Sequence, residues 1–437
     1  MCAPARPEAI SFMLYTFMEM TRAAMLPWRT AANVARSTLR SPLNPMGDTL
    51  AGRTAAAAAD VFESLTRYYG KPEWGIGHTE VNGRPVGVEI ETVWRKPFCN
   101  LLHFSRDRSA LAGARKVKVQ SLDDPRLLIV APMSGHYATL LRGTVEAFLP
   151  THEVYITDWA DARMVPLLEG RFGLGDYVEY VREMITVIGP GAHVAAVCQP
   201  GPPVLAALAL MSQDKDPARP ATMTFMGSPI DARKSPTVPN KLAEERPFEW
   251  FRDNLIHTVP SVYPGALRRV YPGFLQLTGF INMNYERHVD AHYEYFNDLV
   301  KGDGDSSDKH RQFYDEYLSV MDLTEEFYLE TIAEVFQAHA LPQGNFEVKG
   351  RRVDPSAITD IALLTVEGEN DDISGIGQTQ AAHTLCSSLP KALREDYIQP
   401  GVGHYGVFNG RRFREEIAPR MVAFMERHAH KARGKAA

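Results

Sequence analysis

Residues 193–200 read His-Val-Ala-Ala-Val-Cys-Gln-Pro, a buried-strand pattern followed by a cysteine and a helix start. The run from His193 to Val197 is almost wholly apolar, which is typical of a strand buried on both faces of a parallel sheet. The apolar residues 204–211 predict a helix directly afterwards, and Pro200 suits its first turn because the missing N–H is not needed there. Cys198 is therefore predicted to stand at the corner between a buried strand and a helix.

The same alternation continues on both sides of this corner. Short apolar runs bounded by turn residues predict buried strands, and longer amphipathic runs between them predict helices. The strands are expected at 127–131, 154–159, 193–197, 221–226 and 361–366, with a weaker one at 397–398. The helices are expected at 138–148, 174–187, 204–211 and 413–428. Alternation at this spacing indicates an α/β fold with a mainly parallel sheet covered by helices on both faces.

Two further segments differ from this pattern, and together they set the domain organisation. Residues 9–70 read as helical, broken at Pro27 and at 41–45, and a pair of half-buried strands is expected at 86–94 and 100–104. Between the fourth and fifth buried strands the sequence is rich in proline and aromatic residues and has few strand signals. The expected units are a helical N-terminal extension over 1–80, a core over 81–235 and 359–437, and a largely helical cap insertion over 236–358.

A strand-to-helix corner is where α/β-hydrolases place their nucleophile, usually within the pattern G-x-S-x-G. The turn is sharp, so small residues are expected two positions to either side; here Ala196 and Pro200 stand there. Taken alone, an apolar-flanked cysteine is more often a small buried hydrophobic residue than a catalytic one.

Two later segments supply the partners that a catalytic Cys198 would need. Asp371 follows the strand expected at 361–366, at the edge where the catalytic acids of open α/β sheets project. His404 lies in the glycine-rich loop 401–406. Nucleophile, acid and histidine occur in the α/β-hydrolase order, which predicts a Cys198–His404–Asp371 triad. Asp372 is the alternative acid; the spacing from Gly368 favours Asp371.

The predicted chemistry is ester hydrolysis through an acyl-thioester. His404 would take the proton of the thiol while Asp371 holds the imidazole in the useful tautomer. The oxyanion needs two donors, one of which is expected to be the backbone N–H of Gln199. The other is expected from Met133 or Ser134 in the loop after the first buried strand. His136, in the same loop, is either a pocket donor or an ordinary loop residue.

At these residues the chain resembles the intracellular poly(3-hydroxybutyrate) depolymerases of bacteria, over nearly its whole length. The segments that carry the resemblance are 131–136, 154–163, 197–200, 228–236, 366–375 and 403–406. The resemblance implies an α/β-hydrolase fold and a Cys–Asp–His triad at Cys198, Asp371 and His404. It also implies action on amorphous storage granules in the cytoplasm, with oligomers and 3-hydroxybutyrate as products, and a granule surface and oligomeric esters as binding partners.

Two other functions compete with this reading. A polyhydroxyalkanoate synthase also uses a Cys–Asp–His triad, but it is expected to keep glycines in G-x-C-x-G, where this chain has Ala196 and Pro200. A catalytically idle protein of the granule coat is the second alternative, and the intact triad argues against it.

Composition excludes several other classes of function. The formal net charge of −6 gives no basic surface for nucleic acid. The four cysteines lack the spacing of a zinc site or a disulfide framework, so we expect no metal and no cofactor. The apolar run 10–20 is interrupted by Glu19 and is too short to span a bilayer, so neither a secretory signal nor a membrane segment is expected. The oligomeric state stays open.

The N-terminal helical region also carries a stripe of methionine and phenylalanine. Its members are Phe12, Met13, Phe17 and Met20. Such a stripe is usually core packing; the alternative is that it docks on a hydrophobic surface such as a storage granule.

Overall fold

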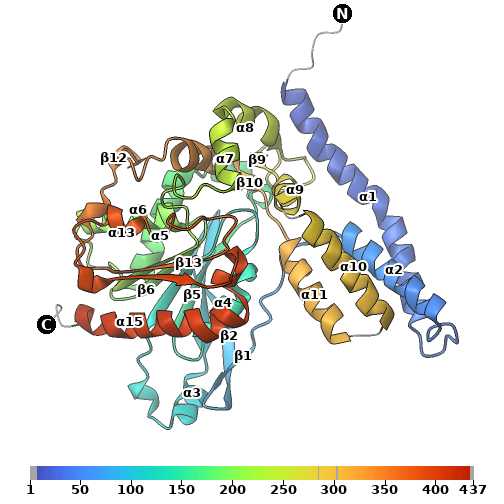
Figure 1. Cartoon of the computed structure of the whole chain (residues 1–437), viewed down its shortest axis with the longest axis horizontal. Helices are drawn as coiled ribbons and strands as arrows, with labels where there is room; N and C mark the ends of the chain where they lie inside the picture. Colours follow the sequence, from blue (N-terminus) through green and yellow to red (C-terminus); the bar gives the residue numbers. More distant parts are fainter. Residues whose placement is uncertain (1–6, 284, 302–303, 434–437) are drawn as a thin grey trace, which may run out of the picture.

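One large sheet forms the centre of the protein, as the computed structural model shows for residues 7–283, 285–301 and 304–433 (Figure 1). Within these residues the sheet has nine strands in the order β1-β2-β3-β5-β4-β6-β7-β13-β14. The pairs β1–β2, β2–β3 and β3–β5 are antiparallel, and all pairs from β5 to β14 are parallel. The strands are β1 (His78–Val81), β2 (Arg84–Lys96), β3 (Cys99–Arg106), β4 (Arg126–Val130), β5 (Glu153–Trp159), β6 (His193–Val197), β7 (Thr222–Met226), β13 (Ala362–Gly368) and β14 (Arg394–Gln399).

The parallel strands are those that the continuous apolar runs predicted. Every residue of β6, β7 and β13 is buried, because helices cover both faces of this part of the sheet. In contrast, β2 alternates between buried and exposed residues over its first half, as expected for an antiparallel strand with one face in solvent. Strand β1 was not predicted, because four residues are too few for a clear period of two.

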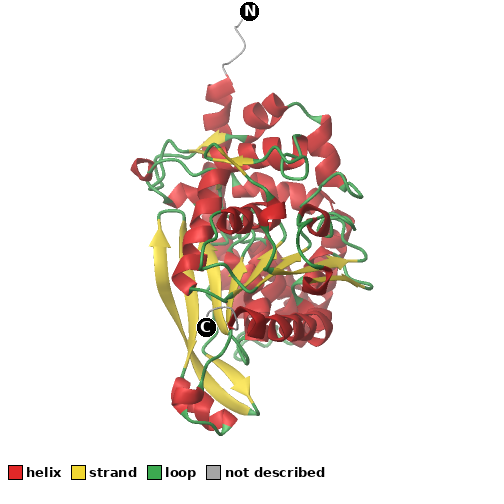
Figure 2. Ribbon diagram, turned by 90° about the vertical axis from the view of Figure 1, so that its left-hand side faces the viewer, coloured by secondary structure: helices red, strands yellow, loops and turns green. Residues whose placement is uncertain are grey.

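Helices cover both faces of the sheet (Figures 1 and 2). Helices α5 (Leu174–Ile188) and α6 (Gly201–Gln213) pack together on one face. On the other, the ring of Phe148 in α4 (Arg142–Phe148) meets Phe413, which precedes α15 (Ala418–Arg433). Shorter helices complete the core: α3 (Arg108–Arg115), α13 (Ala382–Leu385) and α14 (Gly410–Arg412). The predicted α/β-hydrolase fold is confirmed by this architecture, with a mainly parallel sheet and alternating helices.

An insertion separates β7 from β13 and covers the end of the sheet. Its helices are α7 (Val238–Glu245), α8 (Phe248–Leu255), α9 (Gly273–Met283), α10 (Tyr285–Lys301), α11 (Gly304–Tyr317) and α12 (Glu325–Thr331). It also contains strands that were not predicted, namely β8 (His257–Thr258), β9 (Arg269–Tyr271), β10 (Leu323–Thr324), β11 (Glu347–Val348) and β12 (Arg351–Arg352). Each has only two or three residues, which is too short to produce a strand pattern in the sequence.

Two helices precede the sheet, α1 (Pro7–Leu39) and α2 (Leu50–Thr66). The predicted break at Pro27 is wrong, because α1 runs through this residue. Proline leaves the carbonyl of residue i−4, here Ala23, without its usual donor. Pro27 and Ala23 are both exposed, so water can bond this carbonyl and the helix continues. Helices α1, α2, α10 and α11 together form a helical projection beside the hydrolase core (Figure 1).

Candidate active site

Cys198 occupies a strained corner between β6 and α6. The strand ends at Val197, as predicted, and the helix begins at Gly201, three residues before the start that the sequence predicted at Val204. Cys198 has a φ angle of 66°, in the left-handed region that residues with a side chain rarely adopt. Its N–H donates to the carbonyl of Met226 (2.8 Å), and its carbonyl accepts from the N–H of Gly201 (3.1 Å). Strain held by such bonds is characteristic of the nucleophile corner of α/β-hydrolases, where it lifts the side chain above the sheet.

The close approach at this corner falls one residue later than expected. A small residue was expected two positions after Cys198, where Pro200 stands. Pro200 has helical angles (φ −58°, ψ −16°) and directly precedes α6, so it fits this position. At Gly201, by contrast, a β-carbon would lie 2.4 Å from the Cβ atom of Ser228. Glycine is therefore required at 201, because any side chain there would collide with the loop after β7.

Asp371 and His404 meet above the carboxyl ends of β13 and β14. The Nδ1 atom of His404 lies 2.8 Å from the Oδ2 atom of Asp371. The other carboxylate oxygen, Oδ1, accepts the backbone N–H groups of Ile373 (2.9 Å) and Ser374 (2.8 Å). The Asp371 side chain is fully buried, whereas Asp372 is exposed. Of the two candidate acids, Asp371 is thus the one that holds the histidine, and it also caps the turn that follows.

His404 lies between Asp371 and Cys198. Burial by itself would lower the pKa of this imidazole, but its electrostatic interactions with Cys198 and Asp371, and a hydrogen bond to each, raise the pKa well above its ordinary value. Since Nδ1 is taken by Asp371, Nε2 is the nitrogen left for the thiol. The structure therefore brings together the three residues of the predicted triad.

Gly227 allows this arrangement. It has a φ angle of 53°, and a β-carbon built on it would lie 3.1 Å from Cε1 of His404 and 3.2 Å from Oδ2 of Asp371. The residue after β7 thus has to be glycine for two reasons, its backbone angle and the imidazole and carboxylate that lie against it.

The two expected oxyanion donors lie beside Cys198. The backbone N–H of Gln199 belongs to the corner itself, and the N–H of Met133 donates to the side-chain oxygen Oε1 of Gln199 (3.3 Å). Met133 therefore directs its N–H toward the residue next to the nucleophile. Ser134, the other candidate, lines the cavity above. Oε1 is an amide carbonyl oxygen that accepts the N–H of Met133, as the oxyanion of the substrate would.

His136 lines this site and connects its loop to the insertion through a hydrogen bond. Its ring is buried, and its Nε2–H donates to the carbonyl of Tyr317 (3.0 Å) in the insertion. Burial lowers the pKa of His136 to about 4, so the imidazole is neutral near pH 7. Next to it, the carbonyl of Gly135 accepts the N–H of Met321 (2.7 Å). His136 lies in a loop and lines the cavity, but its N–H is bonded to Tyr317, so the structure does not support the alternative that it is a pocket donor.

A cavity of about 320 Å³ lies over Cys198, between the core and the insertion. Most of its walls are apolar, and the insertion supplies half of the lining residues. The lining side chains from the insertion include Val238, Leu242, Tyr271, Phe280, Leu323, Phe327, Tyr328, Ile332 and Phe336. The core contributes Met133, Leu140, Tyr405 and Phe408 beside Cys198 and His404. The aromatic residues that the sequence showed in 236–358 were not recognised as cavity walls, although their abundance was the available signal.

Glu367 is a second structural residue of the site that was not predicted from the sequence. It lies on β13, and its buried carboxylate accepts the N–H groups of Gly377, Thr379 and Gln380 at 2.8–3.1 Å. Burial raises the pKa of Glu367, although these bonds oppose the shift. The carboxylate thereby shapes the loop that begins with Asp371. The signal in the sequence was a lone acidic residue at the end of an apolar strand.

The other cysteines of the described chain, Cys99 and Cys386, are buried, and burial raises the pKa of each thiol. Neither lies in the cavity. Within the described residues, no group of histidine, cysteine and acidic side chains has the arrangement of a metal site. In the same part of the chain, no helix combines the length and apolarity needed to cross a membrane.

Residues 227–429 match the family model described as "PHB de-polymerase C-terminus". The matched region contains Asp371, His404 and the insertion, and it begins after Cys198. The match confirms the resemblance within these residues, which include the segments 228–236, 366–375 and 403–406, and it supports the prediction of an ester hydrolase. Comparison with curated proteins found no match.

Solved structures with a similar arrangement have little sequence in common with this chain. The 2-hydroxy-6-oxo-6-phenylhexa-2,4-dienoate hydrolase BPHD of Rhodococcus sp. strain RHA1 is 10% identical, covers 78% of this chain and 99% of its own, and has a TM-score of 0.42. For the carboxylesterase CesB of Bacillus subtilis these values are 13%, 85%, 98% and 0.39. For the monoacylglycerol lipase of Paleococcus ferrophilus they are 12%, 70%, 97% and 0.37.

Proposed function

We propose that this chain, whose residues 227–429 belong to the PHB depolymerase family, hydrolyses the ester bonds of poly(3-hydroxybutyrate) with Cys198 as nucleophile. The observation that carries the proposal is the hydrogen-bonded pair of Asp371 and His404 beside a cysteine in a strained strand-to-helix corner, under an apolar cavity. Thiol, imidazole and carboxylate in this order are the parts of a nucleophilic acyl-transfer site.

The first half of the reaction forms an acyl-thioester. His404 takes the proton of the Cys198 thiol through Nε2, and the thiolate attacks the ester carbonyl carbon. The carbonyl oxygen becomes an oxyanion that the backbone N–H groups of Gln199 and Met133 bind. For this the Gln199 side chain has to leave the N–H of Met133, with which it is bonded at 3.3 Å. As the carbonyl re-forms, the ester's alcohol oxygen leaves with the proton from His404, and the acyl group remains on Cys198.

The second half releases the acid. His404 takes a proton from water while the hydroxide attacks the thioester carbonyl, and the same two N–H groups bind the oxyanion. Collapse of this intermediate expels the Cys198 thiolate, which regains its proton from His404, and a carboxylic acid product departs. Asp371 takes no part in the proton transfers; its bond to Nδ1 keeps Nε2 directed at the sulfur and stabilises the imidazolium that forms in each half.

The cavity suits a polyester chain. Each repeat of poly(3-hydroxybutyrate) is uncharged and carries a methyl branch beside its ester group. The walls offer mainly aliphatic and aromatic surface, such as Leu242, Phe280 and Phe327, and few charged groups. Such walls favour an uncharged, apolar segment over a charged acyl donor. This supports the polymer and its oligomers as substrates.

We propose storage granules in the cytoplasm as the place of action, as the resemblance to intracellular poly(3-hydroxybutyrate) depolymerases implies; the family match supports the polymer as substrate. The same match favours hydrolysis over polymer synthesis or a purely structural role on the granule. Synthesis would require transfer of the acyl group to a growing chain rather than to water.

The experiment measures 3-hydroxybutyrate released from amorphous poly(3-hydroxybutyrate) particles by the wild type and by Cys198→Ala. We expect release by the wild type and none above background by the variant. The same preparations are incubated with 3-hydroxybutyryl-coenzyme A, from which no polymer should form. A wild type that cleaves short soluble esters but not the particles would retain the hydrolase chemistry and refute the polymer assignment.

A further inference from the structure

Helix α1 exposes its apolar side. The most exposed large apolar side chains between Leu14 and Thr38 are Phe17, Met20, Trp28 and Val34, each between 62% and 66% exposed. Every exposed residue in this range is uncharged. We call this set of exposed side chains the α1 face. A contiguous apolar surface of this kind on a globular protein marks a site of interaction.

The charged residues between Leu14 and Thr38 lie on the opposite side of α1, toward the protein. Glu19, Arg22, Arg29 and Arg36 are all partly buried. Arg22 donates to Glu19 (2.8 Å) and lies over the ring of Tyr68, whereas Arg36 donates to Asp60 (2.7 Å) on α2. The charges therefore face inward and the apolar side chains face outward, the reverse of the usual pattern of a surface helix.

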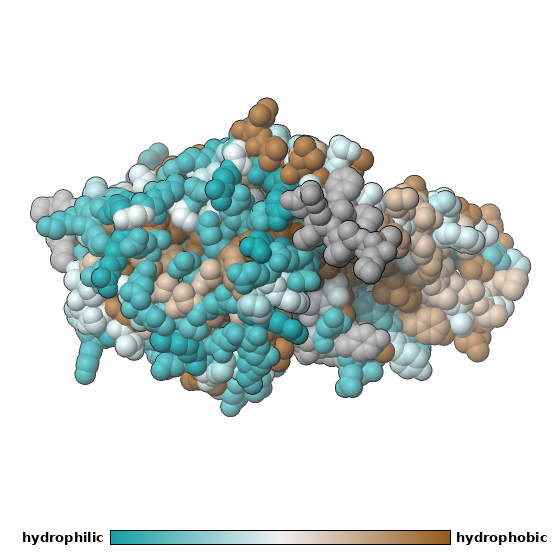
Figure 3. Space-filling view, turned by 90° about the horizontal axis from the view of Figure 1, so that it is seen from above, coloured by the Kyte–Doolittle hydropathy of each residue, from teal (hydrophilic) through white to brown (hydrophobic). Residues whose placement is uncertain are grey.

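Helix α15 shows the usual pattern in the same molecule. Its exposed residues include Arg420, Glu426 and Arg427, whereas Met421 and Phe424 are fully buried. The inversion seen in α1 is therefore absent from α15. Figure 3 shows this difference, with apolar colours over much of the helical projection and hydrophilic colours over most of the core.

We propose that the α1 face adsorbs directly to the uncharged surface of the polyester particle. The proposal rests on the proposed function, because it takes the polymer as the substrate. A helix that binds anionic lipid carries lysine and arginine beside its apolar side, and the α1 face has neither. A helix that pairs in a coiled coil has a narrow apolar seam flanked by charges, and here the uncharged face is broad and contains Pro27. An uncharged, apolar and extended surface is the partner that matches it.

The buried side of helix α1 is connected to the wall of the active-site cavity. On its inner side the hydroxyl of Tyr15 donates to Oδ2 of Asp322 (2.5 Å), and the ring of Tyr15 lies against Phe274 of α9. Oδ1 of Asp322 accepts the N–H of Gly273, the first residue of α9 (2.9 Å). Leu323, which follows Asp322 in the chain, lines the cavity. Adsorption through α1 would therefore hold the cavity walls beside the polymer surface.

The test compares two double variants on the Cys198→Ala background, so that bound particles are not digested. Phe17→Glu with Trp28→Glu places two charges on the α1 face. Val117→Glu with Val187→Glu is the matched control, because both residues are exposed (46% and 49%) and lie on the hydrolase core after α3 and on α5. Partition onto amorphous poly(3-hydroxybutyrate) particles is measured by sedimentation. We expect about tenfold or more weaker partition for the α1 pair and no change for the control.

Catalysis is measured separately, with the same pairs on the active chain and a short soluble ester. The kcat/KM for this ester should stay at the wild-type value in both pairs, because neither pair contacts the cavity. If the glutamate pair does not fold, Phe17→Gln with Trp28→Gln gives the same comparison without charge.

Equal partition of both pairs would overturn the proposal. So would a wild-type dimer in light scattering that the α1 pair makes monomeric while particle binding is unchanged, since the face would then be a subunit interface. Failure of the proposed function looks different: the particles would be bound through α1 but not cleaved by the wild type.

Discussion

The Nδ1 atom of His404 lies 2.8 Å from Oδ2 of Asp371, and the second oxygen of this carboxylate is held by two backbone N–H groups. The acid is therefore fixed on both sides, by the turn that it caps and by the imidazole that it orients. The neighbouring Asp372 is exposed and makes neither of these bonds.

Asp371→Asn should lower kcat by about 10³–10⁴-fold, because an amide in this position favours the wrong tautomer of His404. Asp372→Asn should retain activity within about threefold of the wild type, the usual range for an exposed side chain outside the site. The measurement is hydrolysis of a soluble ester by both variants. Similar losses in the two would contradict the assignment of Asp371.

Gln199→Glu should reduce kcat/KM by about 10²-fold or more. A carboxylate at this position would accept the N–H of Met133 more strongly than the amide oxygen does, and it would repel the oxyanion that needs this donor. Gln199→Ala keeps the backbone N–H and frees that of Met133, so its kcat/KM should remain near the wild-type value. Steady-state kinetics that show both variants at wild-type rates would contradict the position of the oxyanion site.

Gly201→Ala should destabilise the fold by about 1–3 kcal/mol, the usual cost of overpacking. The new methyl group would lie 2.4 Å from the Cβ atom of Ser228, so β6, α6 or the loop after β7 must shift. Chemical denaturation measures the free energy of unfolding, and Ala209→Gly in the same helix provides a comparison without a collision. A Gly201→Ala chain as stable as the wild type would show that the corner tolerates a side chain.

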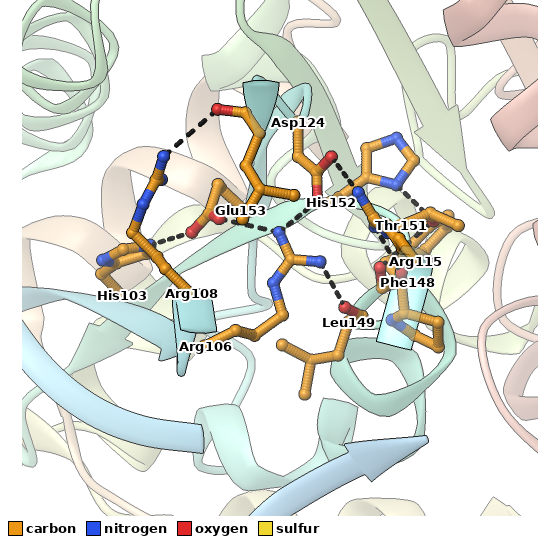
Figure 4. Close-up of polar contacts among 12 residues, drawn as sticks. His103, Arg106, Arg108, Arg115, Asp124, Phe148, Leu149, Thr151, His152 and Glu153 are labelled. Atoms are coloured by element: carbon orange, nitrogen blue, oxygen red, sulfur yellow. Dashed lines mark hydrogen bonds and ion pairs between the residues drawn. The ribbon is translucent and has the colours of Figure 1, made fainter. Parts of the chain in front are cut away.

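Acid should destabilise the protein through His152, which lies beside the ion pairs of Arg106 at the other end of the sheet (Figure 4). Burial lowers the pKa of His152 to about 4 in the folded state, against about 6.5 when unfolded. Its stabilising contribution is thus complete above pH 6.5 and is lost as the pH falls toward 4, by about 1.4 kcal/mol per pH unit.

His152→Asn removes this titration, because asparagine gains no proton in either state. We expect its unfolding free energy to fall less steeply between pH 6.5 and 4.5 than that of the wild type. Denaturant titrations at several pH values within this window provide the comparison. Parallel pH dependences in the two proteins would show that His152 is protonated as readily when folded.

Much of the core could be predicted from the sequence because its strands are buried on both faces. The run 193–197 coincides with β6, the run 154–159 begins one residue after β5, and the run 127–131 is shifted by one residue from β4. Burial on both faces demands a continuous apolar segment, which is the strongest strand signal that a sequence offers. Strands such as β8 and β10 hold two residues each and leave no such signal.

The site could be predicted only in part, for a related reason. Cys198, Asp371 and His404 each follow the carboxyl end of a different parallel strand. Their meeting at one edge of the sheet could therefore be predicted. The bond between Gln199 and Met133, the cavity walls from the insertion and the inverted exposure of α1 depend on tertiary packing. In α1 the apolar stripe was visible in the sequence, but the side on which it lies was not; the side chains of Phe12 and Met13 lie outside the described residues.

Cys198 as the nucleophile is tested most directly by detection of the covalent acyl-enzyme intermediate. Wild type and Cys198→Ser are mixed with a soluble 3-hydroxybutyrate ester, quenched in acid during turnover and examined by peptide mass spectrometry. We predict a 3-hydroxybutyryl group on the peptide that contains Cys198 in the wild type, removable by neutral hydroxylamine as expected of a thioester. An active wild type that carries the acyl group on another residue would contradict the assignment of Cys198 as the nucleophile.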